Sequence, residues 1–179
     1  MRKLILSGGL ALLLPACALA QSTAAPTAAA MSSGTMTPHL GTHDKNFITK
    51  AAAAGMAEVQ DGQLAETKGD SAVQAIGRRM VADHGKANQQ LSGIASSKGV
   101  APPEAVDAKD AAMTDHLQGL SGAAFDTAYL KGQKKAHLQA IRLFNAEAAD
   151  GTDPDLKAFA TATLPTLKEH LSMIEAAQK

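Results

Sequence analysis

Cysteine is nearly absent from this 179-residue chain. The only cysteine, Cys17, lies near the N-terminus, inside a segment that we expect to be removed from the mature protein. The rest of the chain therefore has no disulfide, no thiolate ligand for a metal and no cysteine nucleophile. Such a chain has to be stabilised by its core alone.

Aromatic and strand-forming residues are also scarce. Tryptophan is absent, aromatic residues make up 3% of the chain, and β-branched residues do not occur in runs. Alanine, by contrast, is abundant, and it is the strongest helix former. The composition therefore predicts an all-α protein.

Neither sign of charge is in excess, since 17 basic residues balance 17 acidic ones. A near-neutral chain argues against nucleic acid as a partner. The sequence also lacks a Gly-rich phosphate loop, a nucleophile elbow and a paired-carboxylate spacing. We therefore predict no catalytic residues and favour a binding protein over an enzyme.

The N-terminus has the pattern of a secretory signal. A basic start, an apolar run over residues 4–14 and small residues ending at Ala20 predict a signal peptide over residues 1–20, and the run is too short to span a bilayer. We expect an exported, periplasmic protein with no transmembrane segment after signal removal. The Leu-Pro-Ala-Cys sequence ending at Cys17 resembles a lipobox, so the alternative is a protein anchored through a lipid on Cys17.

Residues 21–43 contain mainly Ala, Ser, Thr, Pro, Gly and Met without periodicity, which predicts a flexible tether. It carries His39 and His43, for which we expect no designed metal-binding role. The folded domain is then expected over residues 44–179, long enough for one core.

Helical periodicity and helix breakers divide this domain into four long helices. They are expected after the N-cap Asp44, after the N-cap Ser71, over residues 123–149, and from Pro154 to near the C-terminus with Asp153 as N-cap. The first should stop at Gly69. Pro165 should kink the fourth because its ring clashes with the carbonyl four residues earlier.

A long connection, between Val100 and Gly122, separates the second helix from the third. It contains one short amphipathic piece, on which His116 is expected at the surface. Two short turns and one long connection are typical of a ferritin-like four-helix bundle, in which the middle link crosses from one end to the other. An up-and-down bundle is the alternative.

Each long helix carries one ionisable residue in the middle of its apolar stripe. In the third helix, His137 lies at helical spacing between Leu130 and Phe144. The four residues of this kind are Glu58, His84, His137 and His170.

The positions of these four residues place them near one level of the bundle. At 1.5 Å per residue, Glu58 and His84 lie about 18 and 21 Å from the turn that joins their helices. His137 and His170 lie about 20 and 25 Å from theirs, so His170 is offset by about one turn. All four nevertheless fall near the midpoints of their helices.

One carboxylate and three imidazoles buried without partners would be costly. We expect them either to form a closed polar network or to hold a metal ion. Neutral imidazoles and a single carboxylate suit zinc, iron, copper or nickel, and do not suit calcium or magnesium. Asp126 and Tyr129 are weaker, accessory candidates. Asp83 points about 100° away from His84, so we favour a solvated side chain over the alternative, a role in supporting the ligands.

Five stretches of the chain resemble a known family. The strings FITKAAAAGMAEVQDGQLA, RRMVADH, GAAFDTAYL, KAHLQAIRLF and LPTLKEHL, in this order after a signal peptide, resemble the bacterial DUF4142 family over about residues 44–174. The resemblance implies an exported ferritin-like bundle, often labelled an outer-membrane protein, with no established activity. Its motifs include the positions of Glu58, His84, Asp126, His137 and His170.

The chain departs from the ferritin-like di-iron proteins, which use Glu-x-x-His motifs on two helices. No such motif is present, and Glu58 is the only glutamate expected to face inward. Too few carboxylates remain to bridge two irons, so a mononuclear site is the most that we predict.

Two functions are consistent with these observations. The first is a periplasmic or envelope bundle that binds one transition-metal ion, with a role in stress or metal handling. The alternative is a non-catalytic envelope protein that binds a protein partner and whose polar core is only structural. A redox enzyme would also need an access route to the metal, and the sequence shows none.

Overall fold

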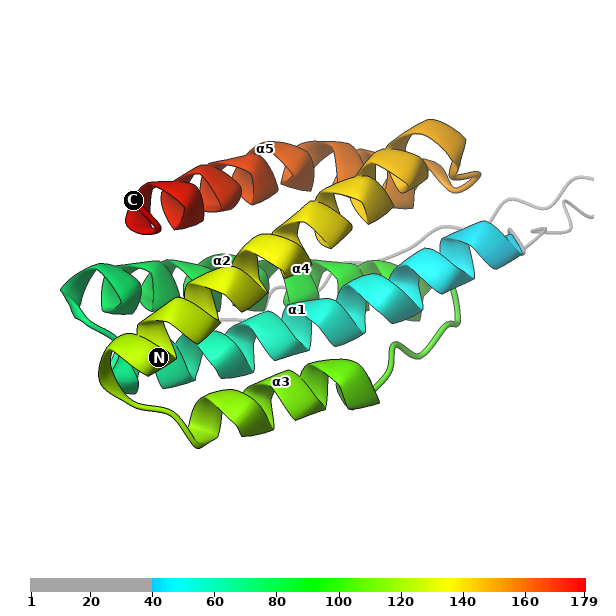
Figure 1. Ribbon diagram of the computed structural model, residues 1–179. Coiled ribbons are helices and arrows are strands. Elements are labelled where there is room, and N and C mark those ends of the chain that lie inside the picture. The colour runs from blue at the N-terminus through cyan, green and yellow to red at the C-terminus, as the bar shows by residue number, and fades with distance from the viewer. Residues whose placement is uncertain (1–39) are drawn as a thin grey trace, which may run out of the picture. The chain divides into compact units, whose positions relative to one another are not determined.

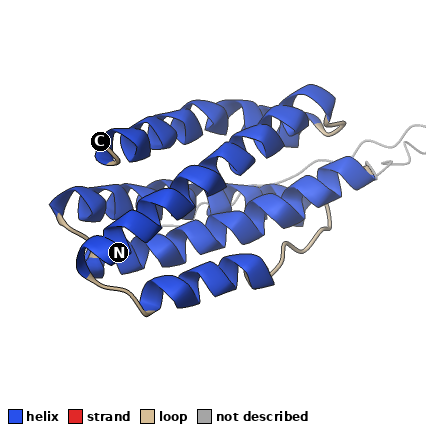
Figure 2. Ribbon diagram, viewed as in Figure 1, coloured by secondary structure: helices blue, strands red, loops and turns tan. Residues whose placement is uncertain are grey.

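The computed structural model describes residues 40–179, and this part of the chain is helical without any strand (Figures 1 and 2). The predicted signal peptide, Cys17, His39 and most of the predicted tether lie outside the described residues. The all-α class is confirmed. The five helices are α1 (Thr42–Lys68), α2 (Ser71–Ser97), α3 (Ala108–Gln118), α4 (Gly122–Asp150) and α5 (Pro154–Ala177).

The four long helices form a bundle in which neighbouring helices are antiparallel. α1 packs against α2 and α4, and α5 packs against α4 and α2. The start of α2 lies beside the start of α4, because the N–H of Asp70 donates to Asp126 Oδ1 at 3.1 Å. The end of α2 lies beside the start of α5, where Lys98 Nζ is 2.8 Å from Asp153 Oδ2.

This arrangement decides between the two predicted topologies. α2 and α4 are consecutive long helices, yet they begin at the same end of the bundle and are not packed neighbours among the main helix pairs. The chain must therefore cross the length of the bundle between them. It does so through the segment that includes α3, which lies against α1 and α4 (Figure 1). The ferritin-like arrangement is confirmed, and the up-and-down alternative is wrong.

The start of α1 differs from the prediction. Gly41 is its N-cap, and the helix begins at Thr42, inside the stretch assigned to the tether. Asp44 lies in the first turn, where its carboxylate accepts hydrogen bonds from the N–H groups of Gly41 (3.2 Å) and Thr152 (2.9 Å). The prediction of Asp44 as N-cap was wrong because the carboxylate connects α1 to the turn between α4 and α5 as well as to its own helix start.

Other helix ends follow local sequence signals more closely. Asp70, and not Ser71, is the N-cap of α2, and its Oδ1 accepts from two N–H groups of the first turn at 2.9 Å. Asp153 is the N-cap of α5, with Pro154 at its first position, as predicted. α1 ends at Gly69 as expected. α5 continues through Pro165, and a kink there stays a prediction.

Small residues bring α1 and α2 close together. A Cβ atom on Gly77 would lie 2.7 Å from the carbonyl oxygen of Gly62, and one on Gly62 would lie 3.0 Å from the carbonyl oxygen of Gly77. A Cβ atom on Gly55 would overlap the side chain of Asn88. These contacts explain why α1 tolerates glycines that lower its intrinsic helix stability.

The core has two apolar clusters. One contains Phe47, Phe144 and Phe159, whose rings meet edge to face or tilted. The other contains Met80 and Phe125 with their neighbours. The buried polar residues near the midpoints of the long helices are Glu58, His84, His137 and His170. No helix within residues 40–179 combines the length and hydropathy that a membrane span requires.

Candidate metal centre

Three histidines from three helices meet inside the bundle. His84 of α2, His137 of α4 and His170 of α5 are 8%, 1% and 0% exposed. One ring nitrogen from each lies within 4.8 Å of the others, and the ring centroids are 5.2 to 5.5 Å apart. His170 therefore reaches the other two histidines, although residue counting had placed it about one helical turn further along the bundle. We name these three residues the histidine centre.

Hydrogen bonds to two of the rings fix which nitrogen carries the proton. His137 Nδ1 lies 3.0 Å from the backbone oxygen of Gln133, which can only accept, so Nδ1 is the protonated nitrogen. His170 Nε2 lies 2.9 Å from Asp83 Oδ2 and donates to it. Burial alone would raise the pKa of Asp83, but hydrogen bonds from Arg79 and His170 outweigh it and lower that pKa. In the neutral rings, His137 Nε2 and His170 Nδ1 therefore carry lone pairs.

These two lone pairs face each other. His137 Nε2 and His170 Nδ1 are 3.3 Å apart, with no proton available between two neutral rings. Two nitrogens bound tetrahedrally to one ion at 2.0–2.1 Å would be about 3.3 Å apart. His84 Nε2 is also buried and has no hydrogen-bond partner. A cation bound among the three rings would remove the repulsion and use the free lone pairs.

The environment keeps the three imidazoles neutral. Burial, and then the neighbouring His137 and His170, lower the pKa of His84 to about 3. Burial lowers the pKa of His137 to about 4, despite the hydrogen bond to Gln133. Burial also lowers the pKa of His170. Neutral imidazole is the form that binds metals, so near pH 7 no proton has to be displaced from the ring nitrogens.

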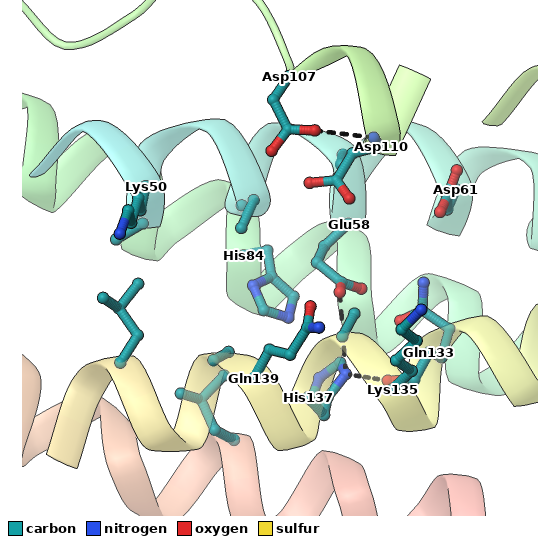
Figure 3. Close-up of a pocket in the computed structure, with 18 of the residues that line it drawn as sticks. Lys50, Glu58, Asp61, His84, Asp107, Asp110, Gln133, Lys135, His137 and Gln139 are labelled. Carbon is teal, nitrogen blue, oxygen red and sulfur yellow. Dashed lines mark hydrogen bonds and ion pairs between the residues drawn. The ribbon is translucent and has the colours of Figure 1, made fainter. Parts of the chain in front are cut away.

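Glu58, the fourth predicted ligand, is near the histidine centre but is not part of it. Its Oε1 lies 3.9 Å from His137 Nδ1, the nitrogen that already donates to Gln133, and not from Nε2, which faces His170 (Figure 3). Its Oε2 is buried without a hydrogen-bond partner. Burial, and then the nearby Asp61, raise the pKa of Glu58 to about 8.

Asp83 has the supporting position that sequence analysis considered but did not favour. The expectation of a solvated side chain was wrong, because its carboxylate orients His170 and also pairs with Arg79. The 100° step from His84 directs Asp83 toward the adjacent helix α5 and not into solvent. A carboxylate that holds a ligand histidine in one tautomer is a common feature of metal sites.

The two accessory candidates lie elsewhere. Asp126 accepts the hydrogen bond from Asp70 at the end of the bundle, about 16 Å along α4 from His137. Tyr129 is fully buried and stacked on Phe125, with ring centroids 5.9 Å apart, and its hydroxyl has no hydrogen-bond partner. Burial, and then the charges of Glu58 and Asp61, raise the pKa of Tyr129.

The remaining histidines of the described chain are not at the centre. His116 is exposed on α3, as predicted. His43 lies at the start of α1, with its Nε2 3.2 Å from the buried carboxylate of Glu147.

A cavity of about 660 Å³ connects the histidine centre with the surface. Buried residues such as Glu58, His84 and His137 line it together with exposed residues such as Asp107 and Lys135 (Figure 3). Its walls come from α1, α2, α3, α4 and α5. This route could not be predicted from sequence patterns, because it depends on how α3 packs against α1 and α4.

The fold is a ferritin-like bundle, and its interior holds a group of three imidazoles. The ferritin-like di-iron proteins differ, because they bind their metals mainly through carboxylates. The sequence matches the family described as "Domain of unknown function (DUF4142)" over residues 25–177, and the chain belongs to that family. The family predicted from the five strings is thus confirmed.

One solved structure shares the fold. It is the crystal structure of a DUF305 fragment from Deinococcus radiodurans, with a TM-score of 0.69 and 13% sequence identity over 78% of this chain and 97% of that one. At this identity the likeness concerns the fold alone. No curated protein matches the chain.

Proposed function

We propose that this DUF4142 protein binds one transition-metal ion at the histidine centre and serves in metal handling or stress protection in the periplasm. One observation carries the proposal: His137 Nε2 and His170 Nδ1 lie 3.3 Å apart, and the hydrogen bonds made by the other nitrogen of each ring leave a lone pair on both. Both rings are held in the tautomer that produces this conflict, by Gln133 and Asp83. A bound cation resolves it.

The donor set indicates the class of metal. Three imidazole nitrogens without thiolates suit zinc, copper, nickel or iron, whereas calcium and magnesium require oxygen ligands. Three protein ligands also leave a fourth position for water or another small ligand. Because His84 and His137 line the cavity, such a ligand has a route to the ion.

The site supports one ion and not an iron-storage or ferroxidase centre. A pair of irons needs several bridging carboxylates. Within residues 40–179, the histidine centre is the sole group of three or more His, Cys, Asp or Glu side chains with this convergence.

Equilibrium titration of the purified, metal-free protein tests the proposal. Zinc, copper, nickel and ferrous ions are added in turn and followed by calorimetry and by competition with a chelator. We expect about one equivalent of at least one of these metals to bind, and binding to be lost in His84→Ala and His137→Ala. At 100 times the dissociation constant, the metal should stabilise the protein by about 2.7 kcal/mol. A melting temperature that none of the four metals changes would reject the proposal.

A second candidate is an envelope interaction protein whose polar core is structural. It is favoured by the hydrogen bonds of His137 and His170 to Gln133 and Asp83, which give two of the rings protein partners. In this case His137→Leu should be tolerated or even stabilising, no metal should be taken up, and cross-linking in the native compartment should recover a protein partner. The two candidates thus give opposite results in the same titration.

A further inference from the structure

Acidic side chains follow one another from the surface to the histidine centre. Asp107 is the N-cap of α3, Asp110 lies in its first turn, and Glu58 and Asp61 belong to α1. All four line the cavity. Asp107 is exposed and Asp110 half-buried, whereas Asp61 and Glu58 are each 6% exposed. In Figure 3 the carboxyl groups of Asp107, Asp110 and Glu58 lead in that order toward His137. We name these four residues the acidic path.

The buried part of the path has hydrogen-bond acceptors without donors. Glu58 Oε2 and Gln133 Oε1 are buried, and neither has a hydrogen-bond partner. Asp61 has one donor, the hydroxyl of Thr114 at 2.7 Å. Burial, together with the negative charge of Asp110, raises the pKa of Asp61 to about 6. Burial also raises the pKa of Asp110. These acids therefore lie close enough to repel one another, and the two buried ones, Glu58 and Asp61, form no ion pair with a lysine or arginine of the described chain.

The basic residues that line the cavity are all exposed. They are Lys50, Lys109 and Lys135. Lys109 lies 3.8 Å from Asp110 Oδ1 and donates to Gln139 at 3.3 Å, so it stays at the surface. The interior is thus lined by acidic, neutral polar and apolar side chains. A cleft lined by charge of one sign attracts ions of the opposite sign and raises their association rate.

We propose that the acidic path guides a divalent metal cation from the surface to the histidine centre, with Glu58 as the last oxygen group that the ion meets before the imidazoles. Asp107 and Asp110 attract the hydrated ion, and Asp61 and Glu58 replace part of its water inside the cavity. The ion then passes to His84 and His137, because imidazole nitrogens hold the borderline transition metals better than single carboxylates do. This inference rests on the proposed metal binding. It adds a route of entry, and an experiment can disprove that route while the metal site itself stands.

The rate of cobalt uptake tests the path. Co²⁺ is mixed with the metal-free protein in a stopped-flow instrument and followed by its visible absorption, for wild type, Asp110→Asn, Asp61→Asn and the double variant. Asp115→Asn is the matched control, because Asp115 is exposed on the same helix and does not line the cavity. We expect association to slow about threefold for each path variant and about tenfold for the double variant at low salt. The control should stay within about twofold, and the difference should shrink in 0.5 M salt.

Equilibrium binding in the same samples separates the path from the metal site. All the variants should still take up one equivalent of Co²⁺. Equal rates for Asp110→Asn and Asp115→Asn would overturn the path while leaving the metal site intact. Failure of the wild type to bind any Co²⁺ at equilibrium would instead overturn the metal site, and the path with it. Glu58→Gln should keep the stoichiometry, and complete loss of binding in this variant would contradict a transit role.

Discussion

Two groups of buried polar residues in this bundle differ in how their hydrogen-bonding atoms are paired. At the turn between α4 and α5, Asp44 accepts from the N–H groups of Gly41 and Thr152, and Asp153 pairs with Lys98 at 2.8 Å. We name these residues the turn network. At the histidine centre, by contrast, two ring nitrogens face each other with lone pairs, and the Nε2 of the third ring has no partner.

The difference indicates what each group does. Buried polar groups in folded proteins are nearly always paired, so exceptions need an explanation. In the turn network, Asp44 and Asp153 make their hydrogen bonds and ion pair with protein atoms, and these contacts hold helix ends together. At the histidine centre, an electron-pair acceptor such as a metal ion would satisfy the two facing nitrogens and the unpartnered Nε2 of His84. The predictions that follow separate these two behaviours.

The largest effect is expected for His137→Ala. Because the ring supplies a nitrogen that no other described side chain can replace at that position, metal affinity should fall by more than about 100-fold. Titration with a competing chelator measures the change. His116→Ala is the control, since His116 is exposed on α3, and an equal loss in both variants would show that the metal binds elsewhere.

A smaller loss of affinity is expected for Asp83→Asn. The carboxylate fixes the tautomer of His170, and changes of this kind typically cost 10- to 100-fold in metal affinity. Glu169→Gln is the matched control, because Glu169 also pairs with Arg79, at 3.3 Å, but does not contact the histidine centre through any hydrogen bond described. If the two variants bind metal equally well, Asp83 does not support the site.

The turn network should respond in stability and not in metal binding. Asp44→Ala leaves the N–H groups of Gly41 and Thr152 without their acceptor, and should lower the free energy of unfolding by about 2 kcal/mol. Urea denaturation of the metal-free protein measures it. Asp155→Ala, in a side chain that is 62% exposed, should shift the midpoint much less. If Asp44→Ala bound less metal per protein molecule, the turn network would also affect metal binding, and the proposed difference between the two groups would be wrong.

The smallest effect concerns pH. The pKa of His84 is about 3 in the folded protein against an ordinary value of 6.5, so the unfolded state binds more protons between these values and stability is lost as pH falls. Between pH 7.5 and 5, metal-free wild type should lose about 1 to 2 kcal/mol relative to His84→Leu. Denaturation curves of both proteins at several pH values provide the check, and parallel pH profiles would show that His84 is not held neutral.

Much of the fold could be predicted from sequence because its signals are local. The pair Asp153 and Pro154 starts α5, Gly69 ends α1, and the long link before α4 indicates a crossover. The inward positions of His84, His137 and His170 could be predicted for the same reason, since residue counts along straight helices place all three near the midpoints of their helices, with His170 about one turn away. Helix caps were less predictable, because Asp44 also bonds to a turn more than 100 residues away.

What could not be predicted depends on how the helices are rotated and covered. Glu58 was counted as a ligand because of its level, but its approach to Nδ1 of His137 depends on the rotation of α1 about its axis. Asp83 was assigned to solvent because the position of α5 was unknown. The cavity and the acidic path depend on α3, whose docking between α1 and α4 has no local sequence signal.

X-ray absorption at the metal edge, on protein loaded with one equivalent of zinc, tests the central claim most directly. The account predicts three imidazole nitrogens at about 2.0–2.1 Å from the ion, with the outer-atom scattering of histidine rings. Removing one of them in His137→Ala should lower that scattering. Nearest atoms that are all oxygens, without imidazole scattering, would contradict metal binding at the histidine centre.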